Sequence, residues 1–255
     1  MNYESWGRFP QVEHNIIQPV LWPSSVPQLD CIDGFVLPFG MGRSYGDVCL
    51  NDGNTLIPTR QMRRFIEFDK EEGIFRCEAG VSLEEVLDII VPHGWFLPVS
   101  PGTKYVTIGG AIANDIHGKN HHVRGTFGCH VRQFELVRSS GEHFLCSREK
   151  NPNLFAATIG GLGLTGLIVW AEFELISIPG PGILMDRIRF GSLDEFFSLS
   201  AESERSCEYT VAWIDCFAGL TNLGRGIFIR GQATASENRL RRSRKSQSMR
   251  VSGPG

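Results

Sequence analysis

The chain has 255 residues, of which 42% are hydrophobic and 21% charged, so one or two globular domains with a substantial core are expected. A formal net charge of −3 gives no general attraction to nucleic acids, and nucleic-acid binding is not expected. The seven cysteines are scattered without a C-x-x-C pair, which argues against a zinc ribbon or a disulfide framework. Because neither a signal peptide nor a transmembrane segment is recognisable, we expect a cytoplasmic protein.

The first part of the chain alternates short strand-like runs with a few helical ones. Residues 35–38 form an apolar run that ends at a glycine-rich segment, and residues 74–79 alternate apolar and polar side chains as a half-buried strand does. Ser82 and Glu85 have the spacing of a capping box, so a helix is expected to begin directly after Ser82.

Further strands follow in the middle of the chain. Residues 134–138 and 142–146 predict a hairpin, residues 153–159 a short helix, and residues 167–178 one long strand. Few helices among antiparallel strands indicate an α+β fold.

A Pro-Gly-Pro-Gly run at 179–182 marks the expected domain boundary. Beyond it, strands are predicted at 183–190, 209–216 and 226–230, with a helix capped by Ser192 between the first two. We therefore divide the chain into a first domain at 1–179, an incomplete second domain at 183–232, and a basic tail at 233–255 that is expected to be disordered.

The segment at residues 38–48 has the character of a phosphate-binding loop. A strand-like run enters three glycines, so main-chain amides can approach the oxygens of a nucleotide diphosphate. Ser44 and Tyr45 add hydroxyl groups, and Arg43 adds a positive charge. A tight β-turn is the alternative explanation when these glycines are considered alone.

A second glycine-rich segment favours the nucleotide interpretation. Residues 107–110 end in a Gly-Gly pair, and Ala111 and Ala113 then allow a helix to pack closely against a ligand. The N-terminus of that helix would offer free amides to a phosphate. Polar residues follow directly at 115–122. Two such segments in one chain predict a nucleotide site better than two unrelated turns.

Residues 161–166 fit the pattern G-x-G-x-x-G literally, but their context is wrong for a dinucleotide-binding Rossmann loop. That fingerprint needs a strand before it and a helix after it. Here the helical run 154–157 precedes the glycines and a strand follows them. We therefore reject NAD binding through this loop, and leave open that it contacts a ligand.

His117, His121 and His122 raise the question of a metal site, because H-x-x-x-H places two rings on one face of a helix. Gly118 and Asn120 are poor helix formers, and no third ligand of obvious type is nearby. We expect no metal here. His117 is interpreted as a polar group beside a cofactor ring, with a structural hydrogen-bonding histidine as the alternative.

The glycine segments resemble the FAD-binding fold of the vanillyl-alcohol-oxidase type, also called PCMH-type. The resemblance rests on the runs at 42–47, 101–113 and 115–122, with support from 6–8, 160–166, 211–215 and 223–225. It covers residues 6 to 232, and within the family it is greatest to oxidases of a polyprenyl-phosphate ribose. It implies a two-subdomain FAD-binding fold followed by the start of a second α+β substrate domain.

The resemblance also implies which residues hold FAD. The 38–48 loop would cradle the pyrophosphate, residues 114–117 would lie near the flavin, and Ile168 would touch the adenine side. His117 is the candidate catalytic residue, with Tyr45 as a weaker one. The full implied set is Pro38, Phe39, Gly40, Met41, Gly42, Arg43, Ser44, Tyr45, Gly46, Asp47, Val48, Gly102, Thr107, Ile108, Gly109, Gly110, Asn114, Asp115, Ile116, His117 and Ile168.

Two departures from the family pattern matter. Related sugar oxidases often carry a histidine in the first segment that bonds covalently to the flavin, but Arg43 stands at that place here, so non-covalent FAD is expected. Family members are also longer, and their second domain completes the substrate pocket and supplies a late lysine and cysteine. We therefore expect a C-terminally truncated form.

The function implied by the resemblance is FAD-dependent oxidation of a sugar hydroxyl, the 2′-hydroxyl of a polyprenyl-phosphate ribose, to a ketone. Hydride transfer to the flavin would carry the chemistry. The implied partners are that lipid-linked sugar and a short-chain reductase that completes an epimerisation, and peripheral contact with the inner membrane is left open. The alternatives are a sugar-lactone oxidase of the arabinono-lactone type and an inactive flavin-binding remnant.

Overall fold

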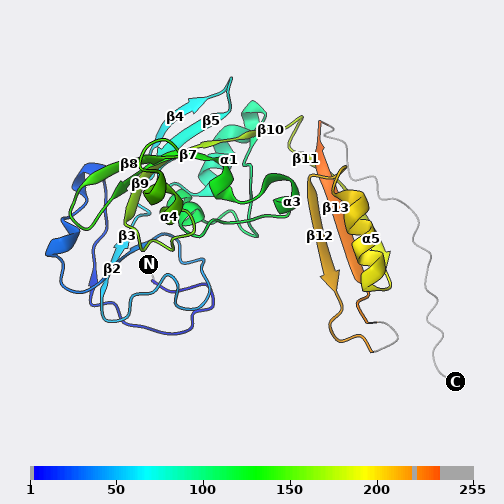
Figure 1. The fold of residues 1–255 in the computed structure, drawn as a ribbon, viewed down its shortest axis with the longest axis horizontal. Helices are drawn as coiled ribbons and strands as arrows, with labels where there is room; N and C mark the ends of the chain where they lie inside the picture. The colour runs from blue at the N-terminus through cyan, green and yellow to red at the C-terminus, as the bar shows by residue number, and fades with distance from the viewer. Residues whose placement is uncertain (1–2, 220–222, 236–255) are drawn as a thin grey trace.

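The computed structural model describes residues 3–219 and 223–235 (Figure 1). The α+β prediction is confirmed. A five-stranded antiparallel sheet with the order β4-β5-β9-β7-β8 forms its centre. The strands are β4 (Phe65–Asp69), β5 (Ile74–Glu78), β7 (Val131–Val137), β8 (His143–Ser147) and β9 (Leu167–Glu174). The predicted hairpin is the β7–β8 pair, in which Phe134 lies opposite Cys146.

A smaller parallel sheet brings the first glycine segment to the core. It has the order β1-β3-β2 and consists of β1 (Ile16–Ile17), β2 (Val36–Phe39) and β3 (Thr55–Pro58). Leu56 and Ile57 of β3 are fully buried, and burial of such side chains stabilises the fold by about 1.5–3 kcal/mol each. β2 ends at the buried Phe39, so the glycine segment begins directly after a well-packed strand.

Helices cover one face of the five-stranded sheet: α1 (Leu83–Ile90), α2 (Ile108–Ala113) and α4 (Pro152–Thr158) contribute to one continuous apolar core with it. The predicted capping box at the start of α1 is confirmed, because the Ser82 hydroxyl accepts from the Glu85 N–H and the Glu85 carboxylate accepts from the Ser82 N–H. A short helix, α3 (His121–Arg124), lies outside this layer.

The predicted single strand at 167–178 is wrong in its last part. β9 ends at Glu174, and the N–H of Leu175 donates to the carbonyl of Gly73 at 2.7 Å, one position beyond the last pair of the β5–β9 ladder. Residues Ile176–Ser177 then form β10, which pairs with β6 (Trp95–Phe96) in a separate two-stranded sheet. The pattern of apolar and polar residues across 167–178 does not show which strand each residue pairs with, so it could not reveal this change of partner.

A second sheet begins after the Pro-Gly-Pro-Gly run. It has the antiparallel order β11-β13-β12, with β11 (Gly182–Phe190), β12 (Tyr209–Ile214) and β13 (Gly226–Thr234). Helix α5 (Leu193–Ser203) packs on one face through Phe196, whose ring lies 5.7 Å from that of Phe190 and 6.1 Å from that of Phe228. Figure 1 shows this sheet and helix beyond α3, at the side of the main body. β13 extends past residue 232, and the expected tail from residue 236 on lies outside the described residues.

The second sheet is joined to the main body through the segment that carries α3. The Glu208 carboxylate accepts hydrogen bonds from Arg124 Nε at 2.9 Å and from Asn120 Nδ2 at 3.0 Å, and the Thr210 N–H donates to the Lys119 carbonyl. Burial alone would raise the pKa of Glu208, but these hydrogen bonds outweigh it and hold the pKa below its ordinary value. The junction is therefore an ionic one at neutral pH.

No helix within residues 3–219 and 223–235 is long and apolar enough to cross a membrane.

Candidate cofactor site

A cavity of about 750 Å³ lies between the two glycine-rich segments, within the size range of cofactor sites. The first segment and the start of α2 approach each other here, since a Cβ added at Gly40 would lie 2.5 Å from Thr107 Oγ1. Most residues implied by the family resemblance line this cavity: Pro38, Gly40, Met41, Gly42, Arg43, Ser44, Tyr45, Val48, Gly102, Thr107, Gly109, Gly110, Asn114, Ile116, His117 and Ile168.

Five residues of the implied set do not line the cavity: Phe39, Gly46, Asp47, Ile108 and Asp115. Phe39 is buried against Tyr3, and Ile108 is fully buried in the main core. The Asp115 carboxylate accepts from the Gly128 N–H at 2.8 Å, so it fixes the following loop. The side chains of Phe39, Ile108 and Asp115 thus hold the protein around the cavity, and contact of all five residues with FAD stays a prediction.

The cavity is also lined by residues outside the implied set: Trp6, Cys49, Thr59, Ala79, Pro101, Thr103, Val106, Ala113, Leu162, Gly163, Gly166 and Leu167. Sequence reasoning missed Cys49, Thr59, Ala79 and Leu167, whereas it left ligand contact open for the 161–166 loop. This literal G-x-G-x-x-G loop supplies several of the lining residues. As predicted, helix α4 precedes this loop and strand β9 follows it, which is the reverse of the Rossmann order. Burial raises the pKa of the Cys49 thiol, so it is kept protonated beside the cavity.

The main-chain N–H groups of Gly40 to Arg43 have no hydrogen-bond partner in the described part of the chain. Gly42 adopts a φ of +62°, which side-chain-bearing residues rarely adopt, and it helps to turn successive amides outward. Unpartnered amides next to a cavity are the donors that a diphosphate needs. The first segment therefore leaves donors unpartnered beside the cavity, and its role in binding the pyrophosphate stays a prediction.

The second segment differs from the prediction of free amides at a helix N-terminus. The N–H groups of Ile108 and Gly109 donate to the carbonyls of Val81 and Ala79, both at 2.8 Å, and the Gly110 N–H donates to Thr107 Oγ1 at 3.1 Å. All three donors are therefore used within the protein. Helix α2 forms the floor of the cavity and is not an anion site by itself.

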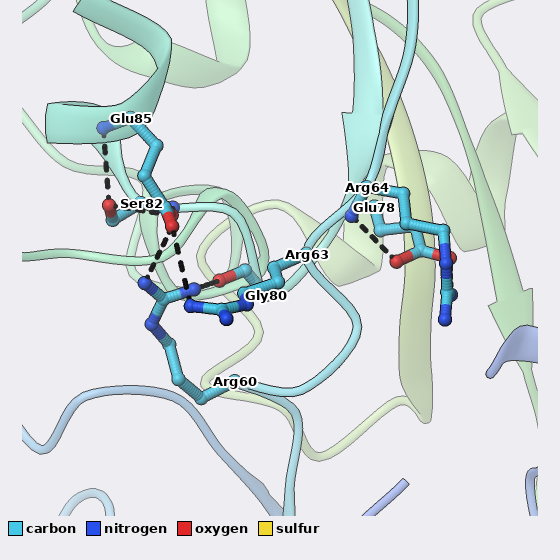
Figure 2. A network of polar contacts seen from close by, with 7 residues as sticks. All are labelled: Arg60, Arg63, Arg64, Glu78, Gly80, Ser82 and Glu85. Atoms are coloured by element: carbon cyan, nitrogen blue, oxygen red, sulfur yellow. Dashed lines mark hydrogen bonds and ion pairs between the residues drawn. The ribbon is translucent and has the colours of Figure 1, made fainter. Parts of the chain in front are cut away.

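A network of charged side chains holds the turn on which α2 rests (Figure 2). Arg60 donates to the carbonyl of Gly80 and to the Glu85 carboxylate, both at 2.9 Å, and Glu85 also accepts from Ser82. Burial alone would raise the pKa of Glu85, but hydrogen bonds from Arg60 and Ser82 outweigh it and lower the pKa. The turn is thus fixed by an ionised carboxylate.

The same network is anchored at its other end by a buried ion pair. Glu78, at the end of β5, accepts from the N–H and the guanidinium of Arg64, both at 2.8 Å. A Cβ at Gly80 would collide with the carbonyls of Thr59 and Met62, so only glycine fits at this position of the turn. Ala79, which both lines the cavity and accepts from Gly109, is held between these contacts.

Asn114 joins the two glycine segments directly. Its Oδ1 accepts from the Ser44 hydroxyl at 3.3 Å, although the two residues lie 70 positions apart, and its Nδ2 donates to the Gly110 carbonyl at 2.9 Å. Because the amide group bonds to both sides, it sets the distance between the first segment and the end of α2.

Three polar side chains at the cavity could take part in binding or catalysis: Arg43, Tyr45 and His117. Tyr45 is 76% exposed and His117 is exposed, so both can meet a substrate that enters from solvent. The His117 ring contacts the His121 ring edge-on, with centroids 6.1 Å apart. Within the described residues, no group of three or more His, Cys, Asp or Glu side chains could hold a metal ion.

Comparison with known proteins defines the class of this site. Residues 34–147 match a family described as FAD binding domain, so this part of the chain is similar to FAD-binding domains and the cofactor is FAD. The resemblance to FAD-binding proteins of the vanillyl-alcohol-oxidase type is thereby confirmed. The fold agrees, because alkyldihydroxyacetonephosphate synthase superposes with a TM-score of 0.71 at 14% identity, over 85% of this chain and 46% of that one.

Individual relatives are similar over much of the sequence. The chain is 41% identical over 198 residues to decaprenylphosphoryl-beta-D-ribose oxidase of Mycolicibacterium smegmatis, which is 77% of this chain and 43% of that protein. It is 29% identical to L-gulonolactone oxidase of Mus musculus over 54% of this chain and 31% of that protein. The chain therefore spans less than half the length of the curated relatives it matches.

The glycines of the site lead to a first prediction. A Cβ at Gly102 meets no atom within 4 Å, whereas one at Gly109 would lie 3.1 Å from the Ala79 Cβ. Gly102→Val should therefore weaken FAD binding by at least about tenfold while the melting temperature of the apoprotein stays unchanged, and Gly109→Val should lower both. Flavin titration and thermal unfolding measure the two quantities.

Gly219→Val is the matched control for Gly102→Val, because its Cβ also meets no atom and it does not line the cavity. Unchanged FAD affinity in Gly102→Val would show that the cofactor does not use this part of the cavity.

The lowered pKa of Glu85 leads to a second prediction. A carboxylate whose pKa is lower in the folded state stabilises the protein above its unfolded pKa, about 4.3, and this stability is lost as the pH falls through the folded value. Glu85→Gln should cost about 1–2 kcal/mol at pH 7 and little at acidic pH. Denaturant unfolding at pH 7 and pH 3.5 measures this difference.

Glu84→Gln is the control, since Glu84 pairs with the half-exposed Lys104 instead of holding the turn. If Glu85→Gln were equally destabilising at both pH values, the ionised network would not be what fixes the turn.

Proposed function

We propose that the chain binds FAD non-covalently in this cavity, through the lining residues of the implied set. The observation that carries the proposal is the pairing of unpartnered amides at Gly40 to Arg43 with a cavity floor formed by α2. Arg43 adds a positive charge at the same place and supports a bound diphosphate. The open space above Gly102 supports the fit of a large cofactor.

The proposed activity is that of an FAD-dependent oxidoreductase that oxidises a sugar hydroxyl, the 2′-hydroxyl of a polyprenyl-phosphate ribose, to a ketone. The 41% identity to an oxidase of decaprenylphosphoryl ribose supports this substrate class. FAD, when bound, supplies the acceptor for the hydride that leaves the substrate carbon. Because the chain covers 43% of that relative, reduction of the flavin by substrate has to be tested on this chain itself.

Residues of this chain would supply positioning and proton transfer. Loss of hydride from a carbinol leaves a proton on the hydroxyl oxygen, and a neutral imidazole is suited to accept it near neutral pH. His117 is the imidazole that lines the cavity, and the exposed Tyr45 hydroxyl is a second polar group there. Apolar lining residues such as Ile116 and Val106 would exclude water from the reacting atoms.

The remaining expectations are proposals of the same kind. Of the division at 1–179, 183–232 and 233–255, the first boundary is supported by the change from one set of sheets to another at Gly182, whereas β13 runs through Thr234, past the second boundary. A short-chain reductase partner and peripheral contact with the inner membrane are supported only by the lipid-linked sugar in the name of the mycobacterial relative. A sugar-lactone oxidase is the second candidate, supported by 29% identity to L-gulonolactone oxidase.

The visible spectrum tests cofactor and substrate together, as a third prediction. The purified chain, reconstituted with FAD, should retain flavin and show its two absorption bands. Under anaerobic conditions a polyprenyl-phosphate ribose should bleach the band at longer wavelength, whereas L-gulono-lactone should leave it unchanged. A chain that releases all flavin on gel filtration would refute the binding site, and bleaching by the lactone alone would favour the second candidate.

The same assay tests His117. His117→Ala should keep its flavin and lower the bleaching rate by about 10²-fold, the usual contribution of a general base. His121→Ala is the matched control, because its ring contacts that of His117 but does not line the cavity. Equal rates in the two variants would remove His117 from the reaction.

A further inference from the structure

Residues 3–9, called the strap below, lie along the outer side of the first glycine segment. The Trp6 N–H donates to the Ser44 carbonyl at 3.0 Å, and the Tyr3 ring meets the buried Phe39 ring edge-on, with centroids 5.4 Å apart. His14 binds the strap from behind, with its Nε2 3.4 Å from the Tyr3 carbonyl oxygen. The strap is therefore attached to the rest of the protein at Tyr3 and at Trp6.

The strap and the glycine segment fit each other closely. A Cβ at Gly42 would collide with the Glu4 carbonyl, so only glycine lets the strap pass here. Ser5 is buried, and the Arg8 N–H donates to its carbonyl at 3.1 Å, which closes a turn. The conformation of the segment that carries the unpartnered amides thus depends on the strap.

Trp6 is the residue of this strap that lines the cavity. Its indole lines the cavity and is still 55% exposed, and the guanidinium carbon of Arg43 lies 5.5 Å from the ring centre. Cation–π contact of this kind orients the arginine as well as the ring. A large planar side chain in a cavity wall offers an apolar surface that a bound ligand can cover.

We infer that Trp6 is a cofactor-binding residue: the strap closes the outer wall of the cavity, and the Trp6 indole contacts bound FAD and slows its release. The inference rests on the proposed FAD site, and extends it to a residue outside both glycine segments. Trp6 also holds Arg43 over the cavity, so the aromatic ring and the positive charge act on the cofactor together.

The test is the rate of FAD release from the full chain, followed by flavin fluorescence after dilution. Trp6→Ala should raise the release rate about tenfold, because an apolar contact of an aromatic ring with the cofactor is lost. Trp6→Phe keeps a ring at this position and should stay within about threefold of the wild type. The backbone hydrogen bond to Ser44 is present in both variants, so it does not contribute to the difference.

Trp22→Ala is the matched control. Trp22 is 52% exposed and has Arg64 over its ring at 3.1 Å, but it does not line the cavity, so its loss should leave the release rate unchanged. Thermal unfolding of the apoproteins accompanies each rate, and Trp6→Ala should melt within a few degrees of Trp22→Ala.

Two results would overturn the inference. An unchanged release rate in Trp6→Ala would show that the indole does not contact the cofactor. An equal loss in Trp6→Ala and Trp6→Phe, together with a lowered melting temperature, would show that Trp6 has only a structural role. A wild-type chain that does not retain FAD would refute the proposed function and this inference together, so the two failures are distinguishable.

Discussion

The main-chain hydrogen bonds between the turn at residues 79–82 and the start of α2 determine the shape of the cavity. The carbonyls of Ala79 and Val81 accept from Gly109 and Ile108, so the helix is seated by its backbone before any ligand is present. Gly109 is needed because a side chain would separate the helix from Ala79. The ion pairs of Glu85 with Arg60 and of Glu78 with Arg64 keep the turn in place from behind. A rigid floor of this kind lowers the entropic cost of cofactor binding.

The two glycine segments therefore have different tasks, although they resemble each other in composition. The first keeps the amides of Gly40 to Arg43 free for a ligand and is held in shape by the strap at residues 3–9. The second uses its amides within the protein and contributes a surface. Asn114 connects the two, and the segment after it leads through α3 to the junction with the second sheet at Glu208.

Sequence patterns predicted the elements whose signals are local. The capping box at Ser82 and Glu85, the β7–β8 hairpin and the helix before the literal G-x-G-x-x-G loop all rest on neighbouring residues, and all are present. The break between β9 and β10 was missed because it depends on a change of partner strand, from β5 to β6, and both partners are distant in sequence. Free amides on α2 were predicted because the turn that satisfies them is distant as well. Ala79 carries no motif of its own, and the run 6–8 supports the family resemblance without indicating that Trp6 lines the cavity.

Amide hydrogen exchange with and without FAD tests the central claim, that the first segment donates to the cofactor while α2 is bonded within the protein. Without FAD, the amides of residues 40–43 should exchange quickly and those of residues 108–110 slowly. FAD should slow exchange at 40–43 by at least about tenfold and leave 108–110 nearly unchanged. Fast exchange at 108–110 in the apoprotein, or protection by FAD at 108–110 without protection at 40–43, would contradict the account.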